Sequence, residues 1–274
     1  MKKRILTVLT ILISAITFAC SCNIPKPILE FKSAKYVFEG KVISKIYSID
    51  SLTYTVSFKT SKHYKKGDYP TTLEFTFKSE GKYTGVWTSC DWSVNKDEVW
   101  LVYADYSKEK LSFGYFCSNS KPLGRRTISK NEQKILDNGN SFKLENYIYQ
   151  SENDLTFTKP ISVVDSVLKT GKDKDYEKPF TWLKLFVDEN GNLNSVTTNT
   201  NYQLKNDSIF NLTTEFKIRS RKPLTEFEKD AIELVKKIPK WEIKKHKKTN
   251  IPVPYIRHLS IEYDKVKKEW KYEL

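Results

Sequence analysis

Hydrophobic and polar residues alternate in short stretches through the first half of the chain, which is the pattern of β-strands that bury one face. In residues 52–60, for example, Tyr54, Val56 and Phe58 share one face. Gly40 interrupts the first stretch and predicts a bulge or a sharp bend there. Five or six strands in about a hundred residues predict a small barrel or sandwich. The stretches cover residues 36–44, 52–60, 72–79, 98–106 and 111–117.

A polar connector follows and begins with a short helix. Ser129 can cap this helix together with Glu132 or Gln133, and Gly139 can end it. The polar connector is expected to run to about residue 155.

Beyond the connector, the pattern changes to strands, then a helix, then a strand. Asn190-Gly191 between two apolar runs predicts a β-hairpin. Thr225 and Glu228 have the spacing of a capping box at the start of an amphipathic helix that Pro239 would end. Residues 253–264 predict a closing strand, so this half of the chain is expected to be an α+β domain.

Residues 1–19 have the pattern of a signal peptide. A basic start at residues 2–4 precedes an apolar run that is too short and too N-terminal for a stable membrane span. The small-residue pattern at residues 17–19 fits cleavage before Cys20, which would then begin a secreted or periplasmic protein. The alternative is the lipoprotein pathway, in which Cys20 is acylated and anchors the chain to a membrane.

The chain has four cysteines, Cys20, Cys22, Cys90 and Cys117. Outside the cytoplasm, four cysteines predict two disulfides, for which three pairings exist. A bond between Cys20 and Cys22 would strain the short loop that it closes, and the sequence does not choose between the other two pairings. A zinc site is the competing interpretation, but it requires thiolates that stay reduced.

Charge and chemistry exclude several classes of function. The net charge is +14, and the densest basic run, residues 236–248, includes a single aromatic residue and no nucleic-acid motif, so we interpret it as a solvated helix end and loop and expect no nucleic-acid partner. His63, His246 and His258 fit no catalytic motif and are expected at the surface or in strands. Asp91 is interpreted as a turn residue. The sequence therefore predicts no enzyme, no cofactor and no intrinsic metal.

Several motifs in the first half of the chain resemble a known family. They are Cys20-Ser21-Cys22, AKYVFEGKV at residues 34–42, VWLVYA at residues 99–104 and FCSNSKPLG around Cys117. With the cysteine spacing, they make this region similar to the tissue inhibitors of metalloproteinases and the wider netrin-like group. The resemblance implies an OB-type five-stranded β-barrel with disulfides Cys20–Cys90 and Cys22–Cys117.

In that family, the α-amino group and the backbone carbonyl of the first cysteine chelate the catalytic zinc of a protease. A catalytic zinc ion keeps an open coordination position that such a chelate can fill. The resemblance implies that Cys20 is the zinc contact and that Ser21 points toward the specificity pocket. It also implies that Thr88 and Ser89 lie beside them. The alternative is that the disulfides only staple a barrel together.

A second resemblance covers the second half of the chain. WLKLFVDENGNLNSV from Trp182, FEKDAIELVKKIPKWE from Phe227 and IPVPY from Ile251 are similar to the periplasmic C-terminal domain of TonB. The resemblance implies a small β-β-α-β domain with an exposed strand edge, expected near residues 255–263, that pairs with a partner peptide. It favours the alternative function of a non-catalytic interaction or scaffold protein of the cell envelope.

The sequence thus predicts a chain that is mainly β followed by α+β. The expected divisions are a signal peptide at 1–19, an OB-fold inhibitor-like domain at 20–127, a polar connector with a short helix at 128–155 and a TonB-like domain at 156–274. The expected partner is a zinc metalloprotease or an envelope protein or peptide. A membrane is expected as a partner only if Cys20 is lipidated.

Overall fold

The chain divides into two compact units, Met1–Phe142 and Lys143–Leu274, and is mainly β with a smaller share of helix. A computed structural model describes residues 22–88, 90–124, 126–150, 155–156, 163–238 and 240–274. The predicted signal peptide therefore lies outside the described residues. The boundary between the units falls inside the predicted connector.

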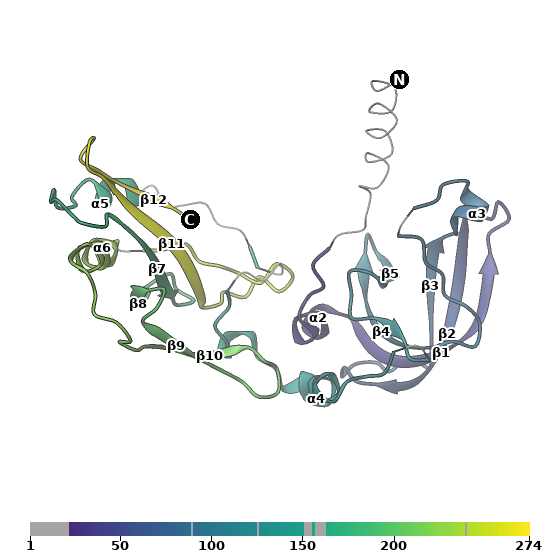
Figure 1. Ribbon diagram of the computed structural model, residues 1–274. Coiled ribbons are helices and arrows are strands. Elements are labelled where there is room, and N and C mark those ends of the chain that lie inside the picture. The colour runs from purple at the N-terminus through teal and green to yellow at the C-terminus, as the bar shows by residue number, and fades with distance from the viewer. Residues whose placement is uncertain (1–21, 89, 125, 151–154, 157–162, 239) are drawn as a thin grey trace, which may run out of the picture. The chain divides into compact units, whose positions relative to one another are not determined.

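The first unit is a curled antiparallel sheet with the strand order β3-β2-β1-β4-β5, and β6 also pairs with β4 (Figure 1). Its helices lie before the first strand, between β3 and β4, and after β6. The elements are α2 (Pro27–Ser33), β1 (Tyr36–Tyr47), β2 (Thr53–His63), β3 (Thr72–Lys78), α3 (Gly81–Thr84), β4 (Val99–Ser107), β5 (Lys110–Ser112), β6 (Lys121–Pro122) and α4 (Lys130–Asn138).

The bulge that Gly40 predicts is confirmed. The register between β1 and β2 shifts between Glu39 and Gly40. A Cβ atom at Gly40 would lie 2.9 Å from Cε2 of Phe38 and 3.1 Å from the carbonyl oxygen of Lys59, so any other residue would have to displace the Phe38 ring and the facing strand. The bulge helps the sheet to curl, because a bulged strand bends and twists more strongly.

Aromatic side chains fill the concave side of the curled sheet. The ring of Phe113, just after β5, lies 4.9 Å from that of Phe75 and 5.2 Å from that of Phe77, both on β3. These contacts bring the two ends of the sheet together. The predicted strand at 111–117 forms only as β5, because Phe113 turns into the core and the chain then runs to Cys117, which is disulfide-bonded.

The helix predicted at the start of the connector is present as α4 and packs on α2 in the first unit. The side chain of Ser129 accepts a hydrogen bond from the backbone N–H of Glu132, as the capping pattern predicts. Gly139 follows the helix with a right-handed backbone conformation. Its role is close approach, since a Cβ atom there would lie 2.6 Å from Cε1 of Phe31.

The second unit has a four-stranded antiparallel sheet in the order β12-β11-β7-β8, with α6 packed on β7 and β8 (Figure 1). A separate hairpin, β9 and β10, also belongs to this unit. Among the described residues, no helix is long and apolar enough to cross a membrane. The elements are α5 (Val163–Leu168), β7 (Phe180–Val187), β8 (Leu193–Thr198), β9 (Tyr202–Asn206), β10 (Thr213–Ile218), α6 (Glu226–Lys236), β11 (Tyr255–Asp264) and β12 (Glu269–Glu273).

Two local predictions for this unit are confirmed. Gly191 has a φ of 80° in the turn between β7 and β8, where the Asp188 carboxylate accepts hydrogen bonds from the backbone N–H groups of Asn190 and Asn192. Thr225 and Glu228 form the reciprocal hydrogen bonds of a capping box. The residue expected to end α6, Pro239, lies outside the described residues.

The hairpin of β9 and β10 was not predicted from the sequence. It covers part of the four-stranded sheet, where Phe216 packs 5.8 Å from Phe186 and the ring of Tyr202 stacks on Phe216 at 5.7 Å. Phe186 pairs with Ile256 across β7 and β11, and Ile256 is buried in the same cluster. The second unit therefore buries apolar side chains on both faces of its sheet.

The bulge gives a direct test of the first unit. We expect Gly40→Ala to lower the free energy of unfolding by about 1–3 kcal/mol, because the added methyl group meets Phe38 and a strand carbonyl. Urea unfolding followed by tryptophan fluorescence measures the change. The matched control is Gly67→Ala, where a Cβ atom would meet nothing within 4 Å. Equal stability of the two variants would contradict the role of Gly40.

Candidate functional site

The predicted site lies in the first unit, and the structure describes part of it. Cys20, Ser21 and Ser89 lie outside the described residues. Cys22 and Cys117 form a disulfide that joins positions 95 residues apart, with 5.6 Å between their Cα atoms. It is the pairing that the family resemblance implies for these two cysteines.

Cys90 is disulfide-bonded as well. Its expected partner, Cys20, lies outside the described residues. Because Cys22, Cys90 and Cys117 are all in disulfides, none of them offers a thiolate to a metal ion. Among the described residues, no group of three or more histidines, cysteines and carboxylates is arranged to hold a metal.

Glu30 of α2 reinforces the disulfide with hydrogen bonds to the segment that follows Cys117. Its carboxylate accepts bonds from the hydroxyl of Ser118 at 2.5 Å and from the backbone N–H of Asn119 at 2.7 Å. The side-chain amide of Asn119 donates to Glu30 at 2.6 Å and to the carbonyl of Pro25 at 3.0 Å. Hydrogen bonds to a carboxylate are stronger than neutral ones, so they fix the helix against this segment.

The other end of α2 is held by Lys65. Its ammonium group donates to the carbonyl oxygens of Phe31 at 2.9 Å and Lys32 at 2.8 Å, and also to that of Ala34. A cation at this position satisfies helix carbonyls that have no partner within the helix and interacts favourably with the helix dipole. Leu29 on the buried face of the helix is fully inaccessible to solvent. The segment that follows Cys22 is therefore tightly fixed to the body of the first unit.

Thr88 lies on the exposed surface of a loop that Asp91 organises. The hydroxyl of Thr88 donates to Oδ1 of Asp91 at 2.8 Å, and the backbone N–H of Gly81 donates to Oδ2 at 3.1 Å. A Cβ atom at Gly81 would lie only 2.8 Å from Oδ2 of Asp91 and 2.7 Å from the Trp87 ring. Asp91 thus has the turn role that the sequence predicts, and it also joins the loop to α3.

A largely buried ion pair lies at the base of the same loop. The ammonium of Lys45 donates to Oε1 of Glu80 at 2.8 Å and to the hydroxyl of Ser93 at 2.6 Å. The side chains of Lys45 and Glu80 are only 11% and 16% exposed. The Ser93 hydroxyl donates to Oε1 of Glu80 at 2.6 Å, and the hydroxyl of Tyr47 donates to the same carboxylate at 3.1 Å. This network joins β1 to both ends of the loop.

The network holds Glu80 in its ionised form. Burial alone would raise the pKa of Glu80, but the hydrogen bonds from Lys45 and Ser93 outweigh burial and lower this pKa from 4.5 to about 2. Burial and the neighbouring carboxylate raise the pKa of Tyr47, so its hydroxyl stays protonated and keeps donating.

Apolar side chains gather on the exposed side of the loop, next to Thr88. Trp87 is 73% exposed and Val86 is 53% exposed. Tyr83 of α3 is also exposed, and its ring lies 4.7 Å from that of Tyr47. We call these residues and Thr88 the loop ridge (Tyr83, Val86, Trp87 and Thr88). Exposed aromatic residues on a held loop are typical of a surface that contacts another protein.

Sequence reasoning named Thr88 but missed the other three residues of the loop ridge and the ion pair of Lys45 and Glu80. Val86 and Trp87 lie between Gly85 and Thr88 in a polar segment, which is a usable signal for exposed apolar residues in a loop. Lys45 and Glu80 are 35 residues apart, and no local pattern predicts that they meet.

The histidines do not form a site. The expectation of surface or strand positions is wrong for His246, which is 1% exposed and bonds Thr249 through Nδ1 at 2.9 Å. Nε2 of His63 bonds the carbonyl oxygen of Pro70 at 3.0 Å. His258 lies on β11, and its pKa is lowered by burial and by the nearby charge of Lys184.

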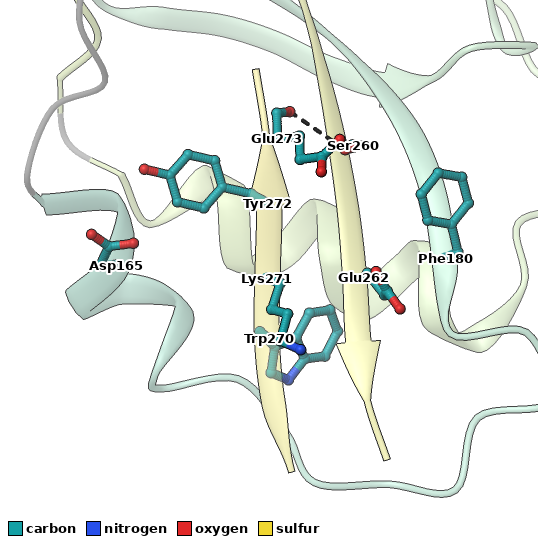
Figure 2. Close-up of a pocket in the computed structure, with 8 residues that line it drawn as sticks. All are labelled: Asp165, Phe180, Ser260, Glu262, Trp270, Lys271, Tyr272 and Glu273. Carbon is teal, nitrogen blue, oxygen red and sulfur yellow. Dashed lines mark hydrogen bonds between the residues drawn. The ribbon is translucent and has the colours of Figure 1, made fainter. Parts of the chain in front are cut away.

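The strand edge of the second unit differs from the prediction. Residues 255–263 belong to β11, which is an inner strand between β7 and β12. The prediction of an exposed strand edge at these residues is therefore wrong. The residues after Tyr263 lack an alternation of apolar and polar side chains clear enough to predict β12. Figure 2 shows the surroundings of β12, where a pocket of about 420 Å³ adjoins the strand and Tyr272 points toward Asp165 of α5. The hydroxyl of Ser260 donates to the carbonyl oxygen of Glu273 at 3.5 Å.

No family model matches this chain, and no curated protein matches it either.

The buried ion pair has a measurable consequence. We expect Glu80→Gln to lower the free energy of unfolding of the first unit by about 3–5 kcal/mol, because it leaves the buried ammonium of Lys45 without a counter-charge. The matched control is Asp97→Asn, which breaks the Lys41–Asp97 pair, where the side chains are 54% and 66% exposed. The control should cost less than about 1 kcal/mol. Urea unfolding of both variants checks this difference.

The same carboxylate predicts a dependence on pH. The pKa of Glu80 is lower in the folded protein than in the unfolded chain, so its contribution is present above about pH 4.5 and is lost as pH falls toward 2. The native protein should lose stability over this interval more steeply than Glu80→Gln does. Parallel pH profiles for the two proteins would contradict the assignment.

Proposed function

We propose that this protein is a secreted or periplasmic, non-enzymatic binding protein that resembles the tissue inhibitors of metalloproteinases and chelates the zinc of a protease through its mature N-terminus. The Cys22–Cys117 disulfide carries the proposal, because it fixes the residue two positions after Cys20 to the body of the first unit. A chelating N-terminus must be held rigidly if it is to enter a protease active site.

The fold of the first unit supports this proposal. An OB-type barrel has five antiparallel strands in which the first strand lies between the second and the fourth, and the third approaches the fifth. The first unit has this order, with contacts between β3 and β5 and a short helix between β3 and β4. The proposed disulfide Cys20–Cys90 would pair Cys90 with the remaining cysteine of the chain.

The proposed chemistry assigns one role to each residue. The α-amino nitrogen and the carbonyl oxygen of Cys20 would fill the open positions of the protease zinc and displace its water. Ser21 would face the specificity pocket of the protease. Thr88 and Ser89 would form the second part of the surface that contacts the protease. The hydrogen bond from Thr88 to Asp91 and the exposed ring of Trp87 support this second part, because a fixed loop loses little conformational entropy on binding.

Localisation follows from the cysteines. Disulfides persist in oxidising compartments, which supports a position outside the cytoplasm. The proposal requires that Cys20 is not acylated, because an acylated amine cannot coordinate zinc. Lipidation and inhibition are therefore mutually exclusive for this chain.

An N-terminal extension by one alanine tests the proposed chelation. The extension converts the α-amino group of Cys20 into an amide and leaves the described core unchanged. We expect the native protein to slow members of a panel of zinc proteases and the extended protein to lose at least tenfold in affinity. The control is a Lys267→Gln variant, altered in the turn between β11 and β12, which should inhibit like the native protein.

Two results would contradict this proposal. One is that the native protein slows no zinc protease in the panel. The other is that the extended protein inhibits as strongly as the native one, which would show that binding does not use the amine of Cys20. Thermal unfolding of the extended protein establishes that it is folded in either case.

A specific observation favours a second function, that of an envelope scaffold whose TonB-like unit docks peptides. In the second unit, the order β8-β7-β11 with α6 before β11 agrees with a β-β-α-β domain. β12 ends this sheet and pairs only with β11 among the described strands. An extended peptide could add to this edge through its backbone, with side chains entering the adjoining pocket.

Hydrogen exchange tests docking at β12. Extended peptides from envelope proteins should slow amide exchange in Glu269–Glu273 by at least about tenfold if they add as a strand. The opposite edge strand, β8, provides the internal control and should exchange unchanged. If no peptide protects β12, or if both edges are protected equally, strand addition at β12 is wrong.

A further inference from the structure

A small cavity lies in the first unit, between residues 91–100 and the residues around Tyr115. Its volume is about 210 Å³, which suits a single side-chain-sized group. It shares Asp91 with the loop of the proposed protease contact, but the proposed zinc chelation does not use the cavity. The residues that define its chemistry are Asp91, Trp92, Glu98, Trp100 and Tyr115.

Three aromatic rings form one wall of this cavity. The rings of Trp92 and Tyr115 are stacked at 5.7 Å, and the ring of Trp100 lies 5.9 Å from each of them. Trp100 is 1% exposed, and its Nε1 donates to Oε2 of Glu98 at 2.9 Å. Trp92 and Tyr115 are partly exposed. The wall is therefore anchored from behind and accessible from the front.

Two carboxylates border this aromatic wall, and the hydrogen-bond donors that the described residues supply to them are uncharged. Glu98 accepts bonds from the backbone and side-chain N–H groups of Asn95, both at 3.1 Å, and from Trp100. Asp91 accepts bonds from the hydroxyl of Thr88 and the backbone N–H of Gly81. Within the described ranges, neither carboxylate has an ion pair. These hydrogen bonds fix the two groups in place, and among the described residues no cation is paired with either charge.

A cation of the chain itself already lies against one ring of this wall. The guanidinium of Arg126 lies 5.4 Å from the centroid of the Tyr115 ring. A cation within about 6 Å of an aromatic face is attracted by the negative charge of the ring face. Fixed aromatic rings beside uncompensated carboxylates are the features of sites that bind ammonium and guanidinium groups.

From this combination, we propose that the cavity is a binding site for an organic cation, either an alkylammonium or a guanidinium group. The group would lie against Trp92, with its charge directed at Glu98 and Asp91. It could belong to a free amine or to a lysine or arginine side chain of a peptide. The site goes beyond the proposed protease inhibition and does not depend on it.

The experiment uses n-butylguanidinium and n-butylammonium as probes, with n-butylurea as the uncharged analogue of similar shape. Binding to the full mature protein is followed by tryptophan fluorescence and by chemical shifts of the tryptophan indole N–H groups. We expect both cations to bind at least tenfold more tightly than n-butylurea. Their affinity should fall as salt is added. A second arm compares free n-butylammonium with a short peptide that contains one lysine and so distinguishes the two sources of the cation.

Variants locate the site. Glu98→Gln keeps the shape of the side chain. It should lower the affinity for both cations at least fivefold and leave the affinity for n-butylurea unchanged. The matched control is Glu109→Gln, a carboxylate in the turn between β4 and β5, which should bind like the native protein. Equal binding of n-butylurea and the cations, no binding of either cation, or an unchanged affinity in Glu98→Gln would overturn the proposal. The comparison of probes on the native protein does not depend on the folding of any variant.

Discussion

The covalent bond between Cys22 and Cys117 is the constraint on which the arrangement of the first unit depends. It closes a loop of 95 residues, and a loop of this length contributes about 4–5 kcal/mol to stability in the chain-entropy account of disulfides. The Glu30 carboxylate accepts hydrogen bonds from the residues that follow Cys117, and the Lys65 ammonium donates hydrogen bonds to carbonyl groups at the end of α2. The start of the described chain is consequently part of the first unit and not a separate tail.

The loop ridge depends on a second constraint, the pair of Lys45 and Glu80. A buried ion pair gains little over apolar residues of the same size, but the loss of one partner is costly. This pair, with Ser93 and Tyr47, fixes the two ends of the loop to β1, whereas Trp87 within the loop is exposed to solvent. A rigid base beneath an exposed aromatic residue is an arrangement that suits binding of another protein.

The local elements could be predicted from the sequence because their causes are local. The alternation around Tyr54 and Val56, the bulge at Gly40, and the caps at Ser129 and Thr225 all depend on residues within a few positions of one another. Each of these features is present in the structure.

The remaining features depend on contacts between distant residues. β12 pairs with β11 across a turn that begins after Asp264. Without β12, residues 255–263 would form an edge strand of the sheet. The hairpin of β9 and β10 gains its stability by covering Phe186 and Ile256, which lie on other strands. Lys45 and Glu80 meet because β1, which carries Lys45, and β3, which precedes Glu80, both pair with β2. For the candidate site, the cysteine pattern pointed to the N-terminal edge, whereas the loop ridge and its base needed the three-dimensional arrangement.

The central claim is that the mature chain begins at an unmodified Cys20 that is joined to the barrel. An acylated Cys20 has a thioether and cannot form a disulfide, which would leave Cys90 without a partner among the four cysteines. The most direct test is the intact mass of the mature protein together with a map of its non-reduced peptides. The account predicts an unmodified Cys20 terminus with peptides linked as Cys20–Cys90 and Cys22–Cys117. Added fatty-acyl mass, or linkage of Cys20 to Cys117, would contradict it.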